Sequence, residues 1–372
     1  MKQVLTVVCK FQLTLEQASN LEATLQAFAD ACNYANQEVD PKTTNKTAIQ
    51  SQTYHEIRSR FGLSANLAVR ACARVGANRK TAKAKKRKVE EFKPTSIDYD
   101  ARIFSFREKD WTVSLTLVNG RERFRLELGN YQIGKLKGQN PTSAQLCKHK
   151  DGCYYIHIQV KSEPPKQRQT AGFLGVDLGR TDIAVTSDGQ KWSGTQVKNT
   201  RDKFARVRAS IQRKGTRGAR RLLKRLSGKE RRFQQWANHT ISKRIVQTAA
   251  TLNATIVIED LTGIRERTNQ QPRSKTERRR SNSWAFYQQR QFLTYKAMAT
   301  GVPLIVVNPA YTSQTCNCCL HIGERKGKRF KCGNCGWIGD ADRNGSIMIA
   351  ISGGAVSRPE RLNCKLPSVA EV

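Results

Sequence analysis

Two closely spaced cysteine pairs near the C-terminal end constrain this chain more than any other feature of its sequence. The pairs are Cys316-x-x-Cys319 and Cys332-x-x-Cys335, and a short basic stretch separates them. Four thiolates at such spacings bind a tetrahedral Zn²⁺ ion, and because they leave no coordination position open, the ion is structural. A redox-active dithiol is the alternative, but two pairs around one short hairpin suit a zinc ribbon better. We therefore predict a zinc ribbon with four cysteine ligands.

The other cysteines have no spacing that indicates a ligand set. Cys318 lies inside the first pair, and we take Cys319 as the ligand because it preserves the two-residue knuckle. The remaining cysteines are interpreted as packing residues or bystanders: Cys9, Cys32, Cys72, Cys147, Cys153 and Cys364. The histidines form no ligand pattern either, and we predict that His239 and His321 face the surface or nucleic acid.

The charge of the chain indicates a polyanionic partner. Among 372 residues, 66 Lys and Arg stand against 30 Asp and Glu, which gives a formal net charge of +36. This bias repels itself in a compact state, and it is spread along the chain instead of gathered in one amphipathic helix, which favours nucleic acid over a membrane surface. We see neither an export signal nor the ~18 apolar residues of a membrane span, so we expect a cytosolic protein with reduced or metal-bound cysteines.

Three acidic residues stand where a strand ends or a helix begins. Asp177 follows the apolar residues 173–176, Glu259 follows 255–258, and Asp342 lies at the start of a predicted helix. Alone, each is better explained as a helix cap or turn carboxylate. Burying an unpaired carboxylate is costly, so three of them in one domain indicate a metal, and oxygen ligands suit Mg²⁺ or Mn²⁺. Together with the charge they predict a phosphodiesterase that uses two metal ions.

The N-terminal half reads as a small β-barrel with a helical insertion. Residues 3–11 predict a strand, and the spacing of apolar residues from about 15 to 88 predicts helices. Segments in which apolar and polar residues alternate, between about residues 96 and 161, predict further strands. The basic run 79–88 fits either a phosphate-contacting face or a solvated helix end. We interpret the aromatic residues on the strands as core residues more than as base-stacking ones: Tyr99, Phe104 and Trp111.

The C-terminal half reads as an α/β domain, because predicted strands alternate with helices. The predicted strands cover residues 173–177, 183–186, 254–260 and 302–307, and the predicted helices cover 199–212, 219–250 and 341–352. Residues 265–280 look like a flexible loop, and 353–372 look like a loose tail.

Several of these segments resemble the TnpB family, transposon-encoded relatives of type V CRISPR effectors. The resemblance rests on motifs that follow one another along the chain: Gly175-Val176-Asp177-Leu178-Gly179, Ile258-Glu259-Asp260-Leu261, Asn308-Pro309-Ala310-Tyr311-Thr312-Ser313-Gln314-Thr315-Cys316, Cys332-x-x-Cys335-Gly336 and Ala341-Asp342-Arg343-Asn344. It covers residues 171–352 closely and the N-terminal half only in architecture.

The resemblance implies an α+β multidomain protein that acts as an RNA-guided, Mg²⁺-dependent DNA endonuclease. Its domains would be a wedge-like β-barrel (1–12 and 92–165), a helical recognition insertion (13–91), a RuvC-like, RNase H-like nuclease domain (171–352) holding the zinc ribbon (312–338), and a tail (353–372). The catalytic Mg²⁺ or Mn²⁺ ligands would be Asp177, Glu259 and Asp342, with Asp340 as the competitor of Asp342. The Zn²⁺ ligands would be Cys316, Cys319, Cys332 and Cys335.

The implied partners are a guide RNA from the transposon end and a double-stranded DNA target that carries a short adjacent motif. No membrane is implied, and we expect one protein chain per RNA in a bacterial cytoplasm, close to the nucleoid. The chain departs from the family pattern at Leu320, Gly345, Ser346 and Met348, none of which is an expected ligand. Two alternatives are an RNA-guided repressor without nuclease activity and an RNA-independent DNA-binding accessory of transposition.

Overall fold

The computed structural model describes residues 3–270 and 272–357. The chain forms an α+β multidomain protein with two compact units, Met1–Glu163 and Pro164–Val372. Within the described ranges, no helix combines the length and apolar character that a membrane span requires.

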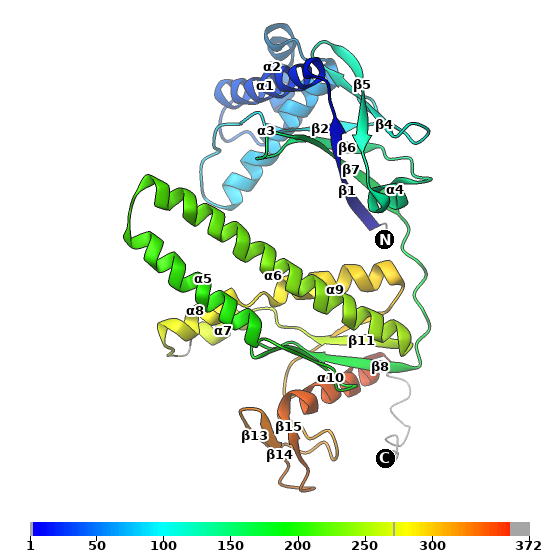
Figure 1. Cartoon of the computed structure of the whole chain (residues 1–372), viewed down its shortest axis with the longest axis vertical. Helices are drawn as coiled ribbons and strands as arrows, with labels where there is room; N and C mark the ends of the chain where they lie inside the picture. The colour runs from blue at the N-terminus through cyan, green and yellow to red at the C-terminus, as the bar shows by residue number, and fades with distance from the viewer. Residues whose placement is uncertain (1–2, 271, 358–372) are drawn as a thin grey trace. The chain divides into compact units, whose positions relative to one another are not determined.

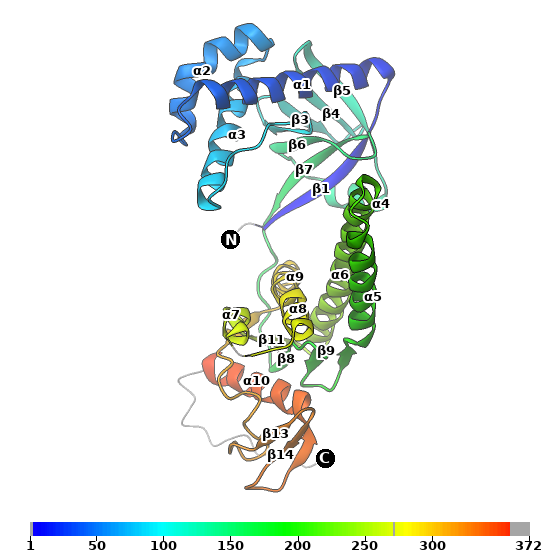
Figure 2. The same cartoon turned by 90° about the vertical axis from the view of Figure 1, so that its left-hand side faces the viewer.

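The N-terminal unit is built on one antiparallel, nearly closed sheet (Figure 2). Its strands, in the order β2-β6-β7-β1-β5-β4-β3, are β1 (Gln3–Gln12), β2 (Ser96–Asp100), β3 (Phe104–Arg107), β4 (Thr112–Leu117), β5 (Gly120–Glu127), β6 (Ser143–Lys148) and β7 (Tyr154–Ser162). The two end strands, β2 and β3, follow each other in the chain, and the Tyr99 hydroxyl donates to the Thr116 carbonyl 3.2 Å away. Tyr99 and Phe104 are buried, and Trp111 packs against the same core, which confirms that they are core residues.

Three helices lie in the stretch where the sequence predicted helices, and a fourth, short helix lies in the later stretch where only strands were predicted. They are α1 (Leu15–Glu38), α2 (Lys46–Phe61), α3 (Ala65–Ala84) and the short α4 (Asn130–Leu136). The first begins at a capping box, in which Thr14 and Gln17 each bond the other's backbone N–H. Its apolar face, with Leu21, Leu25 and Phe28, joins the core of the unit.

The basic run 79–88 is not uniformly exposed, because its first residue is buried. Arg79 is 3% exposed, and its guanidinium donates to the carbonyls of Asn36, Val39, Asp40 and Thr43 at the end of α1. Lys80, Lys83 and residues 85–88 are exposed and remain available to a ligand. Sequence spacing hid this distinction, since it depends on where α1 ends in space.

The C-terminal unit has a five-stranded sheet between helices. Its strands, in the order β10-β9-β8-β11-β12, are β8 (Gly172–Asp177), β9 (Asp182–Thr186), β10 (Lys191–Ser193), β11 (Ala254–Glu259) and β12 (Leu304–Val307). The helices are α5 (Thr195–Arg213), α6 (Arg217–Thr251), α7 (Ile264–Asn269), α8 (Lys275–Ser283), α9 (Phe286–Thr300) and α10 (Ala341–Ser357). Strands β8, β11 and β12 are parallel, whereas β9 and β10 run antiparallel to their neighbours.

Helices lie on both faces of this sheet (Figure 1). Helices α6 and α9 cover one face through Ile241, Ile245 and Leu293, and α10 covers the other through Ile349. Gly175 lets α10 approach β8 closely, because a Cβ at that position would lie 1.9 Å from the carbonyl oxygen of Ser346. The close approach fixes the first turn of α10 beside the end of β8.

Two expectations for this unit are wrong. Residues 265–280 do not form a loop, because α7 and α8 occupy most of the segment, and Ser274 caps α8 by accepting from the Glu277 amide. Residues 353–357 do not form the expected tail, since α10 continues to Ser357. Gly353 and Gly354 lie in that helix against Val257 and Phe173. Residues 358–372, including Cys364, lie outside the described residues.

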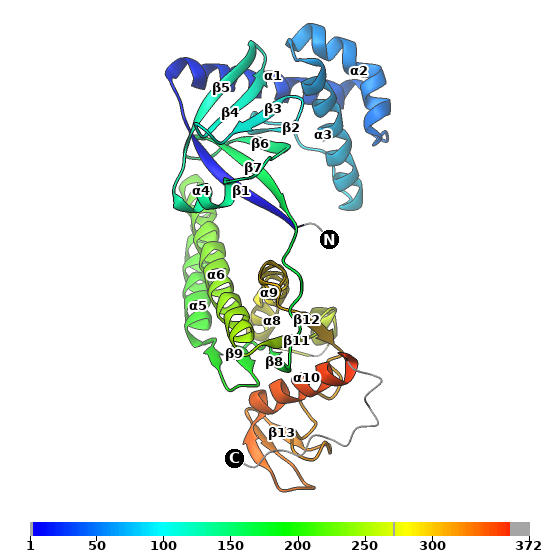
Figure 3. The ribbon, with the colours of Figure 1, turned by 90° about the vertical axis from the view of Figure 1, so that its right-hand side faces the viewer.

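A three-stranded antiparallel sheet precedes α10 (Figure 3). Its strands are β13 (Glu324–Lys326), β14 (Arg329–Lys331) and β15 (Ile338–Asp340). The buried ring of Phe330 packs with Trp337 beside Cys316 and Cys332. This cluster is too small to be a core by itself, which leaves room for a metal to contribute to its stability.

Candidate functional site

The first two predicted carboxylates end neighbouring parallel strands. Asp177 is the last residue of β8 and Glu259 is the last residue of β11. The register pairs Val176 with Ile258, so the two carboxylates follow at the same edge of the sheet. The carboxyl ends of parallel strands are the usual place for a site in α/β sheets.

Helix α10 brings the third carboxylate to this edge. Asp342 lies in its first turn, and Gly345, one turn further, faces Asp177, since a Cβ on Gly345 would lie 3.5 Å from Asp177 Oδ2. The competing residue, Asp340, caps the helix, because its Oδ1 accepts the backbone N–H groups of Asp342 (2.9 Å) and Arg343 (3.0 Å). This geometry favours Asp342 over Asp340 as the third site residue.

The electrostatics of Asp177 reflect these neighbours. Burial is the main cause that raises the pKa of Asp177 to about 7, and the negative charges of Glu259, Asp342 and Asp340 add to it. Burial likewise raises the pKa of Glu259. Desolvation and like charges both disfavour ionised carboxylates, and a bound divalent cation removes that penalty.

Two side chains that the sequence reasoning did not single out take part in the site. Arg325 of β13 donates to Asp342 across a 2.7 Å Nη2–Oδ1 contact. Its positive charge opposes the rise in the pKa of both Asp177 and Glu259, without cancelling it. Thr312 is buried, and its hydroxyl donates to Glu259 Oε1. The only sequence signals were the basic character of the hairpin and the position of Thr312 in the Tyr-Thr-Ser-Gln motif.

The asparagine of the Asp-x-Asn motif joins α10 to the segment before the cysteine cluster. Asn344 is fully buried, its Nδ2 donates to the Thr315 carbonyl at 2.7 Å, and its Oδ1 accepts the Asn317 N–H at 2.9 Å. Asn344 therefore holds the first cysteine pair at a fixed place beside Asp342.

The four predicted cysteines come together. Their sulfur atoms all lie within 4.8 Å of one another, with 3.7 Å between Cys316 and Cys335 and 3.4 Å between Cys319 and Cys332. Four sulfurs about 2.3 Å from a zinc ion lie about 3.8 Å apart, so the arrangement fits Zn²⁺. Bonds from the His321 amide and the Asn334 side chain lower the pKa of Cys319 to about 5, which favours the thiolate.

Among the described residues, these cysteines are the one group of three or more potential metal ligands whose ligand atoms all lie within 4.8 Å of one another. The negative charges of Glu259 and Asp342 influence Asp177, but the three carboxylates lie farther apart than the cysteine sulfurs do. Arg325 is paired with Asp342. Cys318 is exposed and lies outside the cluster, and Cys9, Cys32, Cys72 and Cys147 are buried packing residues. His239 and His321 are exposed, as predicted, and His239 stacks on Phe292 with ring centroids 3.8 Å apart.

Comparisons with known proteins agree with the motifs. Residues 157–265 match the family described as "Probable transposase", and residues 286–349 match the "Cas12f1-like, TNB domain". The chain is 36% identical over 255 residues to the TnpB-like protein MJ0751 of Methanocaldococcus jannaschii, covering 65% of this chain and 86% of that protein. It is 32% identical over 240 residues to the CRISPR-associated endodeoxyribonuclease Cas12f1 of Sulfoacidibacillus thermotolerans, covering 58% of this chain and 54% of that one.

Among solved structures, the chain is similar to that of a Cas12f1–sgRNA–target DNA complex, with a TM-score of 0.41 and 15% identity over 94% of this chain and 99% of the other. A second is the mini-RNA-guided endonuclease CRISPR-Cas_phi3, with a TM-score of 0.49 and 11% identity over 94% and 92%. The identity to MJ0751 over most of that protein, together with the ordered motifs around Asp177, Glu259 and Asp342, shows that this chain belongs to the TnpB family.

Proposed function

We propose that this protein is an RNA-guided DNA endonuclease of a transposable element, with a RuvC-like nuclease domain that depends on Mg²⁺ or Mn²⁺. The observation that carries the proposal is the meeting of Asp177, Glu259 and Asp342 at one sheet edge, where burial and mutual repulsion raise the pKa of Asp177 to about 7. Such a group of acids in a chain of net charge +36 suits a cation-assisted attack on a phosphodiester.

The chain's own residues would position the reaction. Asp177, Glu259 and Asp342 would hold two divalent cations, which supply an activated water and stabilisation of the leaving oxygen. Thr312 orients the Glu259 carboxylate, and Arg325 offsets part of the negative charge at Asp342. Cys316, Cys319, Cys332 and Cys335 would hold a structural Zn²⁺ that keeps the hairpin with Arg325 in place.

The division of labour between the two units is part of the same proposal. The N-terminal unit would hold the guide RNA and the heteroduplex and read a short motif beside the target, with the exposed lysines that follow Arg79 contributing phosphate contacts. Base pairing would select the target, as in other guided nucleases. One protein chain would bind one RNA.

The test begins with purification of the protein together with the RNA encoded at its element's end, followed by cleavage of DNA that matches the guide. We expect Asp177→Asn, Glu259→Gln and Asp342→Asn each to reduce cleavage at least about 1000-fold while RNA binding is retained. Asp260→Asn is the matched control, because Asp260 directly follows Glu259 but has a half-exposed side chain bonded to Thr262 and Arg290. Cleavage that survives loss of any site carboxylate refutes the assignment.

The alternatives give different outcomes in the same experiment. A guided repressor without nuclease activity binds matched DNA tightly but leaves it intact with Mg²⁺ and with Mn²⁺. An accessory that does not use RNA copurifies with heterogeneous RNA and binds matched and unmatched DNA equally.

A further inference from the structure

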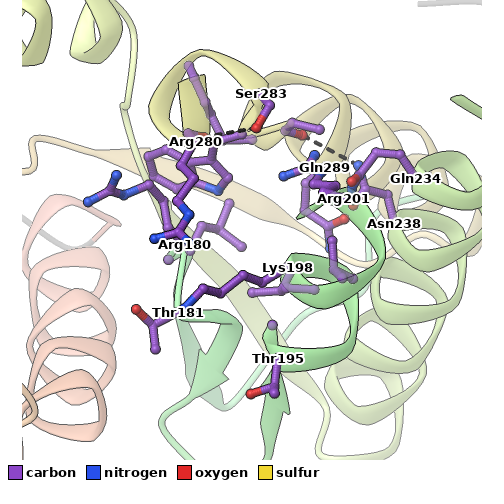
Figure 4. Close-up of a pocket in the computed structure, with 18 of the residues that line it drawn as sticks. Arg180, Thr181, Thr195, Lys198, Arg201, Gln234, Asn238, Arg280, Ser283 and Gln289 are labelled. Carbon is purple, nitrogen blue, oxygen red and sulfur yellow. Dashed lines mark hydrogen bonds between the residues drawn. The ribbon is translucent and has the colours of Figure 1, made fainter. Parts of the chain in front are cut away.

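A hollow of about 270 Å³ lies in the C-terminal unit beside the site (Figure 4). Its walls come from the turn after β8, from α5 and α6, and from the segment of α8 and α9. Among the described residues, none of the three site carboxylates lines it. The hollow is therefore a feature that the proposed cleavage chemistry does not use.

The lining is cationic, and two of its cations are unpaired. Five basic residues face two acidic ones, and the acidic ones are already engaged: Asp202 with Arg279 and Arg280, and Glu277 with Arg180 and Arg280. In the part of the chain that the structure describes, the side chains of Lys198 and Arg201 have no hydrogen bond or ion pair. Burial lowers the pKa of Arg201, and the negative charge of Glu230, which is already paired with Arg208, offsets this only in part. Figure 4 shows Lys198 reaching across the hollow from α5.

Unsatisfied amides lie in the same wall. Gln289 is 2% exposed, and neither its Oε1 nor its Nε2 has a partner; the Oε1 of Gln234 has none either. Asn238, by contrast, is satisfied, because it accepts from Gln234 at 2.8 Å and donates to Gln288 at 2.9 Å. Buried polar groups are nearly always hydrogen-bonded, so one donor and two acceptors without partners, in two residues that line the hollow, leave capacity to bind a polar ligand.

An aromatic surface completes the lining. Trp284 and Phe286 both contribute to it, with ring centroids 5.1 Å apart, and the guanidinium of Arg265 lies over the Phe286 ring. Rings of this kind stack with any nucleobase. Stacking surface, open amides and unpaired cations correspond to the three parts of a nucleotide interaction: the face of the base, its edge and its phosphate.

We propose that this hollow binds one unpaired nucleotide of the nucleic acid that the protein engages, with an adenine or cytosine base. Each of these bases carries an exocyclic amino group beside a ring nitrogen acceptor. The Gln289 amide matches that pair, and the second amino hydrogen is left for Gln234 Oε1. Lys198 and Arg201 bind the phosphate. The inference rests on the proposed function only in that the chain must engage nucleic acid.

Photolabelling tests this site directly. A five-nucleotide RNA with a central 8-azidoadenine is irradiated with the full-length protein, and the labelled peptides are mapped by mass spectrometry. We expect label within residues 275–300, and we expect unlabelled adenine or cytosine oligomers to compete at least about tenfold better than uracil oligomers. RNA and DNA competitors of the same sequence then distinguish the source of the nucleotide.

Matched variants make the test specific. Gln289→Leu should lower labelling of this peptide at least about tenfold, whereas Gln291→Leu, an exposed glutamine on the same helix, should leave it unchanged. Lys198→Ala should weaken labelling whichever base competes, with the exposed Lys203→Ala as its control. Lys198 is itself exposed, so its variant carries the test even where Gln289→Leu fails to fold.

The inference and the proposed function fail separately. Label only outside the lining peptides, or labelling unchanged in both Gln289→Leu and Lys198→Ala, overturns the nucleotide site even where guided cleavage is observed. Specific labelling in a protein that does not cleave matched DNA leaves the nucleotide site standing and removes the nuclease.

Discussion

Arg325 donates to Asp342 across 2.7 Å, and this contact places a cation from the cysteine-rich hairpin among three acidic side chains. The contact joins two elements of different character, β13 and the first turn of α10. It gives the hairpin an electrostatic influence on the site in addition to any structural role.

Replacing Arg325 should shift the pH dependence of the site. Its charge lowers the pKa of Asp177 and of Glu259, so Arg325→Gln raises both, and the carboxylates then lose their protons to admit a metal only at higher pH. We expect cleavage supported by Mg²⁺ to fall several-fold at about pH 6 and less at about pH 8.5. The control is Arg329→Gln, because Arg329 is exposed and lies on the neighbouring strand. If the acid limb of the pH profile of cleavage does not shift in Arg325→Gln, the electrostatic role of Arg325 is contradicted.

Asp177 should destabilise the protein when no divalent metal is bound at the site. Its folded-state pKa, about 7, lies above its ordinary value of 3.8. The free-energy cost of burying the ionised carboxylate is therefore full above pH 7 and disappears as the pH falls toward 4. Asp177→Asn should therefore raise the free energy of unfolding by about 2 kcal/mol at pH 8 in Mg²⁺-free buffer, after allowance for solvent screening. Urea denaturation at pH 8 and pH 4.5 checks this; an equal effect at both pH values would show that ionisation is not the cause.

The cysteine cluster predicts one zinc ion per chain. Cys332→Ser should remove the zinc and unfold the hairpin, because binding of a structural metal is coupled to folding. Cys318→Ser should retain the metal, since Cys318 is exposed and outside the cluster. Elemental analysis of both purified variants makes the comparison, and full zinc content in Cys332→Ser would show that the ligand set is wrong.

Arg79 should behave as a structural residue. Arg79→Ala removes the guanidinium from four carbonyl oxygens at the end of α1, of which that of Asp40 keeps the Thr43 N–H, and we expect a loss of about 3 kcal/mol in the stability of the N-terminal unit. Lys80→Ala should cost under about 0.5 kcal/mol and instead weaken RNA binding slightly, because Lys80 is exposed. Thermal unfolding and RNA titration together separate the two effects; a fully stable Arg79→Ala would refute the capping role.

Gly345 should tolerate replacement by alanine. The added Cβ would lie 3.5 Å from Asp177 Oδ2, an ordinary contact, and would relieve the cost of glycine inside α10. We expect Gly345→Ala to raise stability by up to about 1 kcal/mol without loss of cleavage. Gly175→Ala is the contrasting change, since its Cβ would meet the Ser346 backbone at 1.9 Å; destabilisation by Gly345→Ala as well would indicate a tighter site than the structure shows.

The sequence by itself determined the features that depend on local pattern and spacing. Asp177 and Glu259 could be placed because an apolar run predicts a buried strand and the next polar residue marks its end. Cys316, Cys319, Cys332 and Cys335 could be grouped because knuckle spacing is set by ligand geometry within a few residues. The aromatic residues of the N-terminal strands followed from alternation, which assigns one face of a strand to the core.

Only the tertiary structure decided which charged and polar groups meet. Arg79 looked like its basic neighbours until the end of α1 surrounded it, and Arg325 had no signal beyond a basic hairpin. The segment 265–280 is charged, so its pattern suggested a loop, yet α7 and α8 form there, and α8 lines the hollow that contains Gln289. The physical reason is the same in each case: burial and electrostatic partnership arise between segments far apart in the sequence, and local periodicity carries no information about them.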